Sequence, residues 1–446
     1  MLPFICKYFF YYPAVLLKRQ HVPRYLGELK ESQWYDSRAL EQLQFRKLAL
    51  LLGHAKSNIP YYQKILKNID TESVSSLRDL QQIPILTKEL LKENFNQLLY
   101  PEAKGIVKKT TGGSTGNPVT IYKTGISDGA ANAAYWRGYE WAGVKMCDRQ
   151  ARFWGIPHHK AARRMVRLTD LIVNRMRFSA FSYDETIMED YYNKINCFQP
   201  EYLYGYVSML EAFGKYLLKN NLKMKFQPIS VIATSEVLTE PHRRLFENAF
   251  HCKVFNEYGC GEVGTIAHEC ERGAMHISAE NLIVEILRDG KPVPEGQTGD
   301  IVVTELNNAA MPLIRYNLKD IGFLNPDICS CGRGLPILGK VMGRAYDTIR
   351  NKEGKAFHGE YFMYIFEELQ NMGIRVAAFQ VIQKDYENFV IKAVADEKLR
   401  NAMEDYIAVR VRNSYGSYAE FKFEYVSEVR REHSGKIRLI KSFSDC

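Results

Sequence analysis

A glycine-rich loop at residues 110–118 reads Thr-Thr-Gly-Gly-Ser-Thr-Gly-Asn-Pro. Its glycines let backbone N–H groups approach an anion closely, and its hydroxyl side chains add donors. Such a loop is typical of phosphate binding, but an isolated glycine-rich stretch is as often a plain turn. It is not a Walker motif, because Asn117 and Pro118 follow the last glycine in place of Lys and Ser or Thr. The rest of the chain must decide between the two readings.

Strand and helix patterns alternate after this loop, which indicates α/β architecture. Residues 119–122, 202–205, 230–234 and 253–255 are expected to be strands, with helices at 128–142 and 209–218 and a helical region at 36–100. In open α/β sheets, ligands bind at the carboxyl ends of the strands. Gly205, Ser235 and Glu236 are therefore candidate binding residues.

Two further regions have a different pattern. Apolar residues alternate at 282–286 and 300–304, which predicts a β-rich subdomain over about 265–340. Strands at 378–382, 388–394 and 420–425, with a helix at 396–411, predict a small α+β domain. A chain of 446 residues is too long for one hydrophobic core. We expect an α/β plus α+β protein with an N-terminal segment 1–35, a large domain 36–343 and a small domain 344–446.

The composition limits the partners. The net charge of +9 suits anionic ligands or a membrane surface, but Lys and Arg are spread along the chain and form no nucleic-acid recognition module. Nine cysteines without a regular framework, and without a cleavable signal before them, predict a reducing cytoplasm.

The first 17 residues are apolar and aromatic, but Lys7 and Pro13 interrupt them. This segment is too short to span a bilayer comfortably. With Lys18, Arg19 and Arg24 behind it, it could lie in the interface at the inner face of the membrane. A core-packing helix or a homodimer contact are the alternatives.

Three more segments carry chemically useful residues. Residues 256–264 read Asn-Glu-Tyr-Gly-Cys-Gly-Glu-Val-Gly, residues 312–320 read Pro-Leu-Ile-Arg-Tyr-Asn-Leu-Lys-Asp, and residues 434–438 read Ser-Gly-Lys-Ile-Arg. A tyrosine can stack on a base, and a carboxylate can hold magnesium beside phosphate oxygens. Taken singly, each segment is more readily explained as a turn, a salt bridge or a solvated tail.

Taken in order, the glycine loop, Tyr-Gly-x-x-Glu, Arg-Tyr-x-x-x-Asp, a Gly-Arg pair at 343–344 and the terminal Gly-Lys resemble the core motifs of the adenylate-forming superfamily. That superfamily includes acyl-CoA synthetases, peptide-synthetase adenylation domains and luciferases, and the resemblance covers roughly residues 36–440. Within it, the chain looks most similar to the phenylacetate-CoA ligase branch and its CapK-like relatives of polysaccharide biosynthesis.

The resemblance implies an AMP-forming ligase, in which a carboxylate attacks the α-phosphate of ATP, pyrophosphate leaves, and a thiol or amine captures the acyl-adenylate. It implies that Lys436 bridges carboxylate and nucleotide, Glu262 binds Mg²⁺, Tyr258 with Gly259 packs on adenine, Asp320 and Arg344 hold ribose, and Asp347 is the hinge of a mobile C-terminal domain. The phosphates would be held by Thr110, Thr111, Gly112, Gly113, Ser114, Thr115 and Gly116, with Ser235 and Glu236 nearby. Many relatives carry a lysine where this chain has Val119.

A zinc site is expected between these motifs. Cys270 and His276, followed by Cys329 and Cys331, offer three thiolates and an imidazole, the donor set of a structural zinc site. The arrangement resembles a zinc site of the phenylacetate-ligase branch. Unrelated buried thiols are the alternative, and Cys252, Cys260 and His268 are competing ligands.

The acid and the acyl acceptor stay open. Aromatic pocket candidates are Trp136, Phe153, Trp154, Tyr204, Gly205 and Tyr206, although such residues are more often core. The acceptor is either coenzyme A or an amine or sugar. Phosphoryl transfer is disfavoured by the missing Walker lysine, and a non-catalytic nucleotide-binding relative is the third alternative.

Overall fold

The computed structural model describes residues 2–110, 119–154, 160–179, 185–341, 349–353, 356–357, 372–374, 376–429 and 439–443, with Phe362, Ile365, Phe366, Glu368 and Leu369. The chain divides into two compact units, Met1–Leu318 with Gly322–Lys340, and Lys319–Ile321 with Val341–Cys446. The division along the sequence lies close to the domain border predicted near residue 343.

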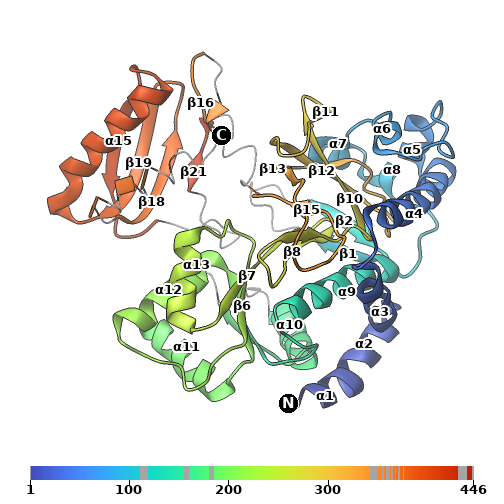
Figure 1. The fold of residues 1–446 in the computed structure, drawn as a ribbon, viewed down its shortest axis with the longest axis horizontal. Coiled ribbons are helices and arrows are strands. Elements are labelled where there is room, and N and C mark those ends of the chain that lie inside the picture. The colour runs from blue at the N-terminus through green and yellow to red at the C-terminus, as the bar shows by residue number, and fades with distance from the viewer. Residues whose placement is uncertain are drawn as a thin grey trace. The chain divides into compact units, whose positions relative to one another are not determined.

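The first unit begins with helices. Asp36 starts the long helix α4, because its carboxylate accepts a hydrogen bond from the backbone N–H of Ala39. The helix α3 (Val22–Ser32) packs along α9 (Gly125–Trp141) of the central region (Figure 1). These N-terminal elements are α1 (Pro3–Ile5), the π-helix η1 (Cys6–Tyr11), α2 (Tyr12–Leu17), α3 (Val22–Ser32), α4 (Ser37–Asn58), α5 (Pro60–Ile65), α6 (Leu77–Leu80), α7 (Lys88–Glu93) and α8 (Phe95–Leu98).

A nine-stranded sheet forms the centre of this unit, in the order β14-β15-β9-β8-β7-β6-β5-β3-β4. Neighbouring strands from β4 to β7 run parallel, and those from β7 to β14 are antiparallel. The strands are β3 (Gln150–Trp154), β4 (Arg175–Ser179), β5 (Tyr202–Tyr206), β6 (Ser230–Thr234), β7 (Lys253–Cys260), β8 (Gly264–Glu269), β9 (Met275–Ile277), β14 (Leu324–Asn325) and β15 (Ile337–Leu338).

Helices cover both faces of the parallel strands, as expected for buried parallel strands (Figure 1). One face packs against α11 (Glu185–Phe198), α12 (Val207–Lys219) and α13 (Glu240–Phe250). The other packs against α9 (Gly125–Trp141) and α3. The helix α10 (Lys160–Ile172) connects β3 to β4.

Two smaller sheets complete the unit. The strands β1 (Val107–Thr110) and β2 (Thr120–Lys123) pair on either side of the glycine loop. The other sheet has the order β11-β10-β12-β13, from β11 (Lys291–Pro292), β10 (Leu282–Arg288), β12 (Gly299–Glu305) and β13 (Tyr316–Gly322). Asp289 and Gly290, both with positive φ, form the turn between β10 and β11. Because β8 and β9 belong to the nine-stranded sheet, position 265 is not a border between sheets.

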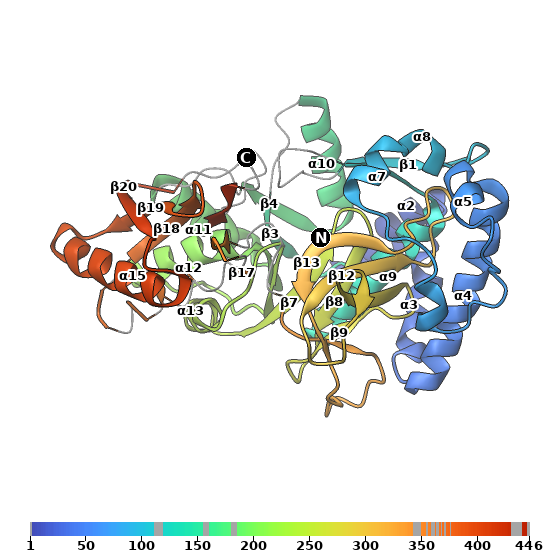
Figure 2. The same ribbon diagram turned by 90° about the horizontal axis from the view of Figure 1, so that it is seen from above.

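The second unit is a small α+β domain. Its sheet has the order β20-β19-β18-β21, and α15 packs on it through Met403, Ile407 and Val411 (Figure 2). The elements are β16 (Ile349–Arg350), β17 (Ala356–Phe357), β18 (Val376–Gln383), β19 (Asn388–Ala395), the short helix η3 (Glu397–Leu399), α15 (Arg400–Tyr415), β20 (Glu420–Tyr425) and β21 (Ile440–Lys441). The predicted α/β plus α+β class is confirmed.

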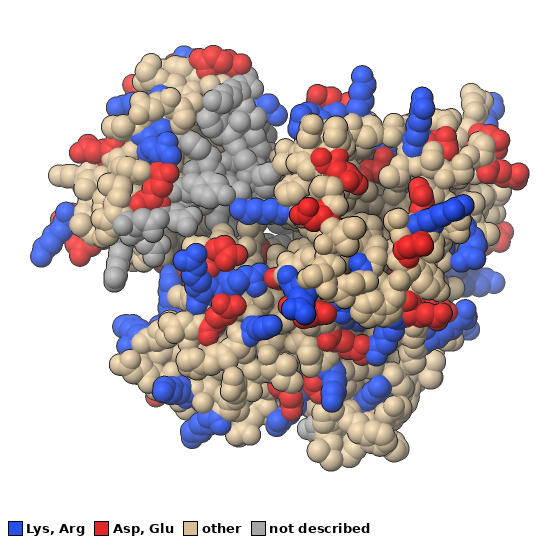
Figure 3. All heavy atoms as spheres, in the orientation of Figure 1, with Lys and Arg blue, Asp and Glu red and all other residues tan. Residues whose placement is uncertain are grey.

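Charged side chains of both signs are interspersed over the face of the molecule seen in Figure 3. None of the described helices is long and apolar enough to cross a bilayer.

Candidate functional site

The carboxyl ends of the parallel strands place several predicted residues at one edge of the nine-stranded sheet. Trp154 ends β3, Tyr204 and Gly205 lie in β5, and Ser235 follows β6. Ser235 has a φ of 68°, a left-handed conformation that is uncommon for a residue with a side chain. Strained backbone often occurs at ligand-binding sites, so this edge is the first candidate site.

Two of the predicted binding residues also have structural roles. A Cβ atom on Gly205 would lie 2.5 Å from the backbone oxygen of Phe153, so the pairing of β3 with β5 requires glycine there. Glu236 accepts hydrogen bonds from the backbone N–H of Ser208 at 2.7 Å and from its hydroxyl at 3.0 Å. Its carboxylate thereby satisfies the N-terminus of α12.

The Tyr-Gly-x-x-Glu segment is mostly strand. We expected a short strand at 253–255, and this length was wrong, because β7 continues through Cys260. The register of the β7–β8 pair shifts at a bulge between Tyr258 and Gly259. A Cβ atom on Gly259 would lie 2.6 Å from the backbone oxygen of Gly264. The glycine therefore permits the pairing of β7 with β8.

The structure brings the second and third motifs together. Tyr316, the tyrosine of the Arg-Tyr segment, donates a hydrogen bond of 3.4 Å to the carboxylate of Glu262. Asp320 lies further along β13 and is 8% exposed. Glu262 is partly exposed, as a residue that meets a ligand must be.

Arg315 of the same motif has a structural role that the sequence did not reveal. Its guanidinium forms a buried, two-bonded ion pair with Glu285 and donates hydrogen bonds to the backbone carbonyls of Gln81 and Ile83. It therefore fastens the N-terminal helical region to the β-rich sheet. No local pattern signals this contact, because its partners lie far apart in the sequence.

Several predicted residues lie outside the described part of the chain. These are Thr111, Gly112, Gly113, Ser114, Thr115 and Gly116 of the glycine loop, with Arg344, Asp347 and Lys436. Thr110 is the last residue of β1, opposite Thr120 of β2. Val119, at the position where many relatives carry lysine, is 1% exposed. A buried position disfavours a lysine ammonium, which accounts for the apolar residue.

The four predicted zinc ligands form one cluster. The ligand atoms of Cys270, His276, Cys329 and Cys331 all lie within 4.8 Å of one another. His276 Nε2 is 3.2 Å from Cys331 Sγ, and its Nδ1 hydrogen-bonds the backbone carbonyl of Leu335 at 3.0 Å. Since a carbonyl only accepts, Nδ1 carries the proton and Nε2 is left as a metal donor.

The three competing zinc ligands, Cys252, Cys260 and His268, are not in this group. His268 is buried instead beside Glu257, with its Nε2 3.9 Å from the carboxylate.

Sequence reasoning missed a group of buried polar residues on the α9 side of the strand ends. The carboxylate of Glu257 in β7 accepts hydrogen bonds from the hydroxyls of Tyr204 (3.2 Å) and Thr234 (3.3 Å). Burial raises the pKa of Glu257 to about 7, although the charge of Arg152 opposes this. Its place directly before Tyr258 was the only available signal.

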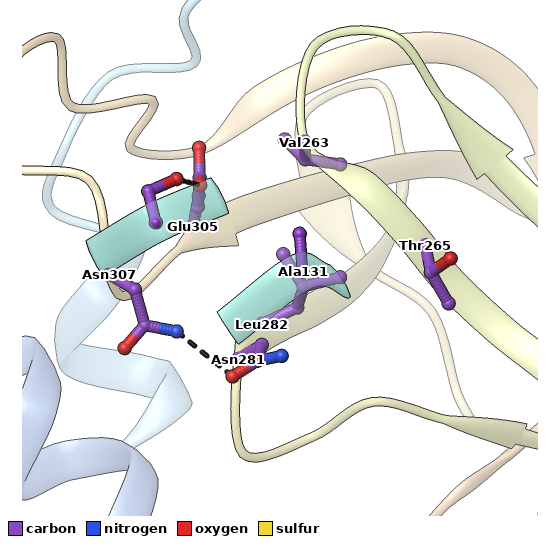
Figure 4. Close-up of a pocket in the computed structure, with 8 residues that line it drawn as sticks. Ala131, Val263, Thr265, Asn281, Leu282, Glu305 and Asn307 are labelled. Atoms are coloured by element: carbon purple, nitrogen blue, oxygen red, sulfur yellow. Dashed lines mark hydrogen bonds between the residues drawn. The ribbon is translucent and has the colours of Figure 1, made fainter. Parts of the chain in front are cut away.

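A small polar cavity lies between α9 and strands β8, β10 and β12 (Figure 4). Its volume of about 10 Å³ suits a water molecule but not a substrate. Glu305 accepts hydrogen bonds of 2.5 Å from Ser127 and Lys123, and Asn307 donates one of 2.9 Å to Asn281. This network stabilises the sheet contact and is not the candidate site.

Known proteins resemble this chain over nearly its whole length. Residues 349–443 match the model of the CapK C-terminal domain. Protein CapK of Staphylococcus aureus is 24% identical over 95% of this chain and 94% of its own, and a phenylacetate-coenzyme A ligase of Thermus thermophilus is 25% identical over 70% and 71%. The crystal structure of 2-hydroxyisobutyryl-CoA ligase in the postadenylation state, in complex with 2-HIB-AMP, superposes with a TM-score of 0.73 at 16% identity, over 92% of each chain. This chain is therefore a homologue of CapK and of the phenylacetate-coenzyme A ligases, with a CapK C-terminal domain and the fold of the adenylate-forming ligases.

Proposed function

We propose that this protein is an AMP-forming ligase that activates a carboxylic acid with ATP. The observation that carries the proposal is the contact of Tyr316 with Glu262, which joins the Tyr-Gly-x-x-Glu and Arg-Tyr-x-x-x-Asp segments. Homology and fold support the same class. In the reaction, a carboxylate oxygen attacks the α-phosphorus of ATP, and the bond to pyrophosphate breaks.

Each of the proposed site residues would have a separate role in this reaction. Carboxylate and triphosphate repel each other, so cationic screening and exact placement are needed. Glu262 would hold Mg²⁺, Tyr258 would pack on adenine, and Asp320 with Arg344 would hold the ribose. The glycine loop would bind the phosphates, and Lys436 would bridge the two reacting anions after the small domain turns about Asp347.

The acyl acceptor is proposed in two forms. Coenzyme A is the first, because the phenylacetate-coenzyme A ligases are homologues. An amine or sugar acceptor in polysaccharide biosynthesis is the alternative, supported by the similarity to CapK over 95% of this chain. A non-catalytic nucleotide-binding relative is a third reading, which the partly exposed Glu262 disfavours.

Exchange of labelled pyrophosphate into ATP tests the activity. A panel of carboxylic acids should reveal at least one that supports exchange, and exchange should depend strictly on that acid. Product analysis with and without coenzyme A then separates the two acceptors. If no acid in a broad panel supports exchange, the ligase assignment is contradicted and a protein that only binds nucleotide is favoured.

We also propose that Cys270, His276, Cys329 and Cys331 hold a structural zinc ion. Three thiolates and an imidazole fill all four positions of tetrahedral zinc, so the ion would fasten the polypeptide and not activate water. The backbone hydrogen bond of His276 Nδ1 orients the ring for this role.

The N-terminal helices present an apolar surface that fits a membrane interface. Cys6, Tyr11 and Val15 are buried, whereas Leu2, Phe4, Phe9 and Leu17 are 69%, 65%, 67% and 87% exposed. The adjacent α10 adds the exposed Met165, Leu168 and Leu171, and the Cys6 thiol lies 3.1 Å from its Ile172 carbonyl. Exposed cations accompany the surface, namely Lys18, Arg19, Arg164 and Arg167. We propose that this face binds anionic lipid.

Vesicle co-sedimentation checks this proposal. The protein should bind vesicles that contain anionic lipid. Binding of the double variant Phe9→Ser with Leu168→Ser should be weaker by about tenfold or more, because each change removes apolar area that would be buried in the membrane. The control is Leu50→Ser, at a 73% exposed apolar position of α4. If the double variant binds vesicles as well as the Leu50→Ser control, the proposal is contradicted. If the protein is a dimer that dissociates in the double variant, the apolar surface is instead a contact with a second copy of the chain.

A further inference from the structure

Three polar side chains at the strand ends have buried atoms without hydrogen-bond partners among the described residues. They are Arg152 of β3, Glu257 of β7 and His268 of β8, and we refer to them as the strand-end polar cluster. The atoms concerned are Arg152 Nε, Glu257 Oε2 and His268 Nε2. Glu257 and His268 are 4% and 3% exposed, so water cannot replace the missing partners freely.

The unsatisfied atoms of Glu257 and His268 face each other. Tyr204 and Thr234 hold Glu257 Oε1, which leaves Oε2 free, 3.9 Å from the free Nε2 of His268. This distance is too long for a direct hydrogen bond. Both atoms therefore remain able to bond a third group.

Arg152 contributes a cation beside Tyr204, whose hydroxyl bonds Glu257. Its guanidinium lies over the rings of Trp154 and Tyr204, at 4.5 and 4.6 Å from their centroids. No carboxylate among the described residues lies within ion-pair distance of it. The neighbouring strand differs, because Arg175 and Arg177 of β4 are both paired with Asp170. Among the described residues, this part of the sheet thus pairs Arg175 and Arg177 with a carboxylate but not Arg152.

An unsatisfied polar group in the interior is costly, so several on one patch indicate a ligand that completes them. The cluster lies at the carboxyl ends of parallel strands, where α/β proteins bind ligands. Glu257 also directly precedes Tyr258, which we assign to adenine. The cluster therefore includes a residue of the same strand that carries the tyrosine assigned to adenine.

We propose that the carboxylic acid carries a neutral hydroxyl group, in addition to its reacting carboxylate, and that this hydroxyl binds between Arg152 and Glu257. A hydroxyl can accept from Arg152 and donate to Glu257. An ammonium group would be repelled by Arg152, and a second carboxylate by an ionised Glu257. This inference rests on the proposed ligase function and names the class of its substrate as a hydroxylated carboxylic acid.

The test uses pairs of acids that differ by a single hydroxyl, such as phenylacetate and 4-hydroxyphenylacetate, or butyrate and 3-hydroxybutyrate. Acid-dependent pyrophosphate release is measured for each member. In the best pair, the kcat/KM of the hydroxylated acid should be about a hundredfold higher than that of its unhydroxylated partner, because the unhydroxylated acid leaves buried polar atoms of the protein unpaired. In Glu257→Met this ratio should fall close to one.

The ratio within each variant is independent of how much protein is folded, so a loss of stability does not obscure it. Tyr202→Phe is the matched control, because it changes a buried side chain two residues from Tyr204 and should keep the ratio. Equal or better turnover of the unhydroxylated acids, or an unchanged ratio in Glu257→Met, would overturn the inference alone. If no acid of any pair supports release, the ligase assignment fails and the inference with it.

Discussion

Lys436→Ala should abolish acid-dependent exchange of pyrophosphate into ATP, with a loss of at least about 10²–10³-fold in rate. The ammonium of Lys436 is proposed to lie between the carboxylate and the α-phosphate as a positioned point charge. Alanine leaves two anions to approach each other without screening. The exchange assay measures this step directly.

The second half-reaction provides the control. Turnover of a preformed acyl-adenylate with its acceptor should be largely unchanged, because the lysine acts only before the adenylate exists. Lys422→Ala, at an exposed lysine of the same C-terminal unit, should leave both half-reactions intact. If Lys436→Ala suppresses both half-reactions equally, the lysine has a general structural role and not the assigned one.

Local sequence patterns predicted those elements whose residues signal their own environment. The strand at 230–234 is continuously apolar between two polar ends, and β6 has these bounds. The alternation at 420–425 likewise gives the bounds of β20. The strand at 253–255 was predicted to end before the glycines of 259–264, although here these glycines allow two paired strands to approach closely. A glycine pattern alone cannot distinguish these cases.

The candidate site could be predicted where its residues form ordered motifs, and not where it depends on contacts between distant strands. The four proposed zinc ligands were named because their spacing resembles a known pattern, and the structure places these side chains together. Glu257 and His268 face each other only because β7 pairs with β8 in one register. The same limit applies to Arg137 and Glu280, a buried ion pair between α9 and the start of β10.

The N-terminal segment both packs in the core and presents exposed apolar side chains. Tyr11 packs against Trp136 in the core and accepts a hydrogen bond of 2.8 Å from its indole N–H. Phe4 and Phe9, from the same run of N-terminal helical elements, are exposed. Core packing of one face therefore does not remove the surface proposed to bind lipid.

Removal of the zinc ion should lower stability more than any single surface change. In Cys329→Ser we expect the bound zinc to fall well below one equivalent. The free energy of unfolding should fall by about 3–5 kcal/mol, since the proposed ion would join the β8–β9 hairpin to the loop between β14 and β15. Metal analysis and thermal unfolding measure the two effects, and a chelator should reproduce them in the unchanged protein.

The expected loss is smaller than the ~10 kcal/mol or more that zinc contributes to isolated zinc-finger peptides. Other contacts also hold this loop, because Arg333 lies over Trp34 and Trp141 and Gly334 donates a backbone hydrogen bond to Gln33. Cys252→Ser is the matched control, because Cys252 is a partly buried thiol outside the cluster. A full equivalent of zinc in Cys329→Ser would exclude this ligand set. Loss of zinc without loss of stability would instead show that these packing contacts alone fix the loop, and the ion would then need a role other than fastening it.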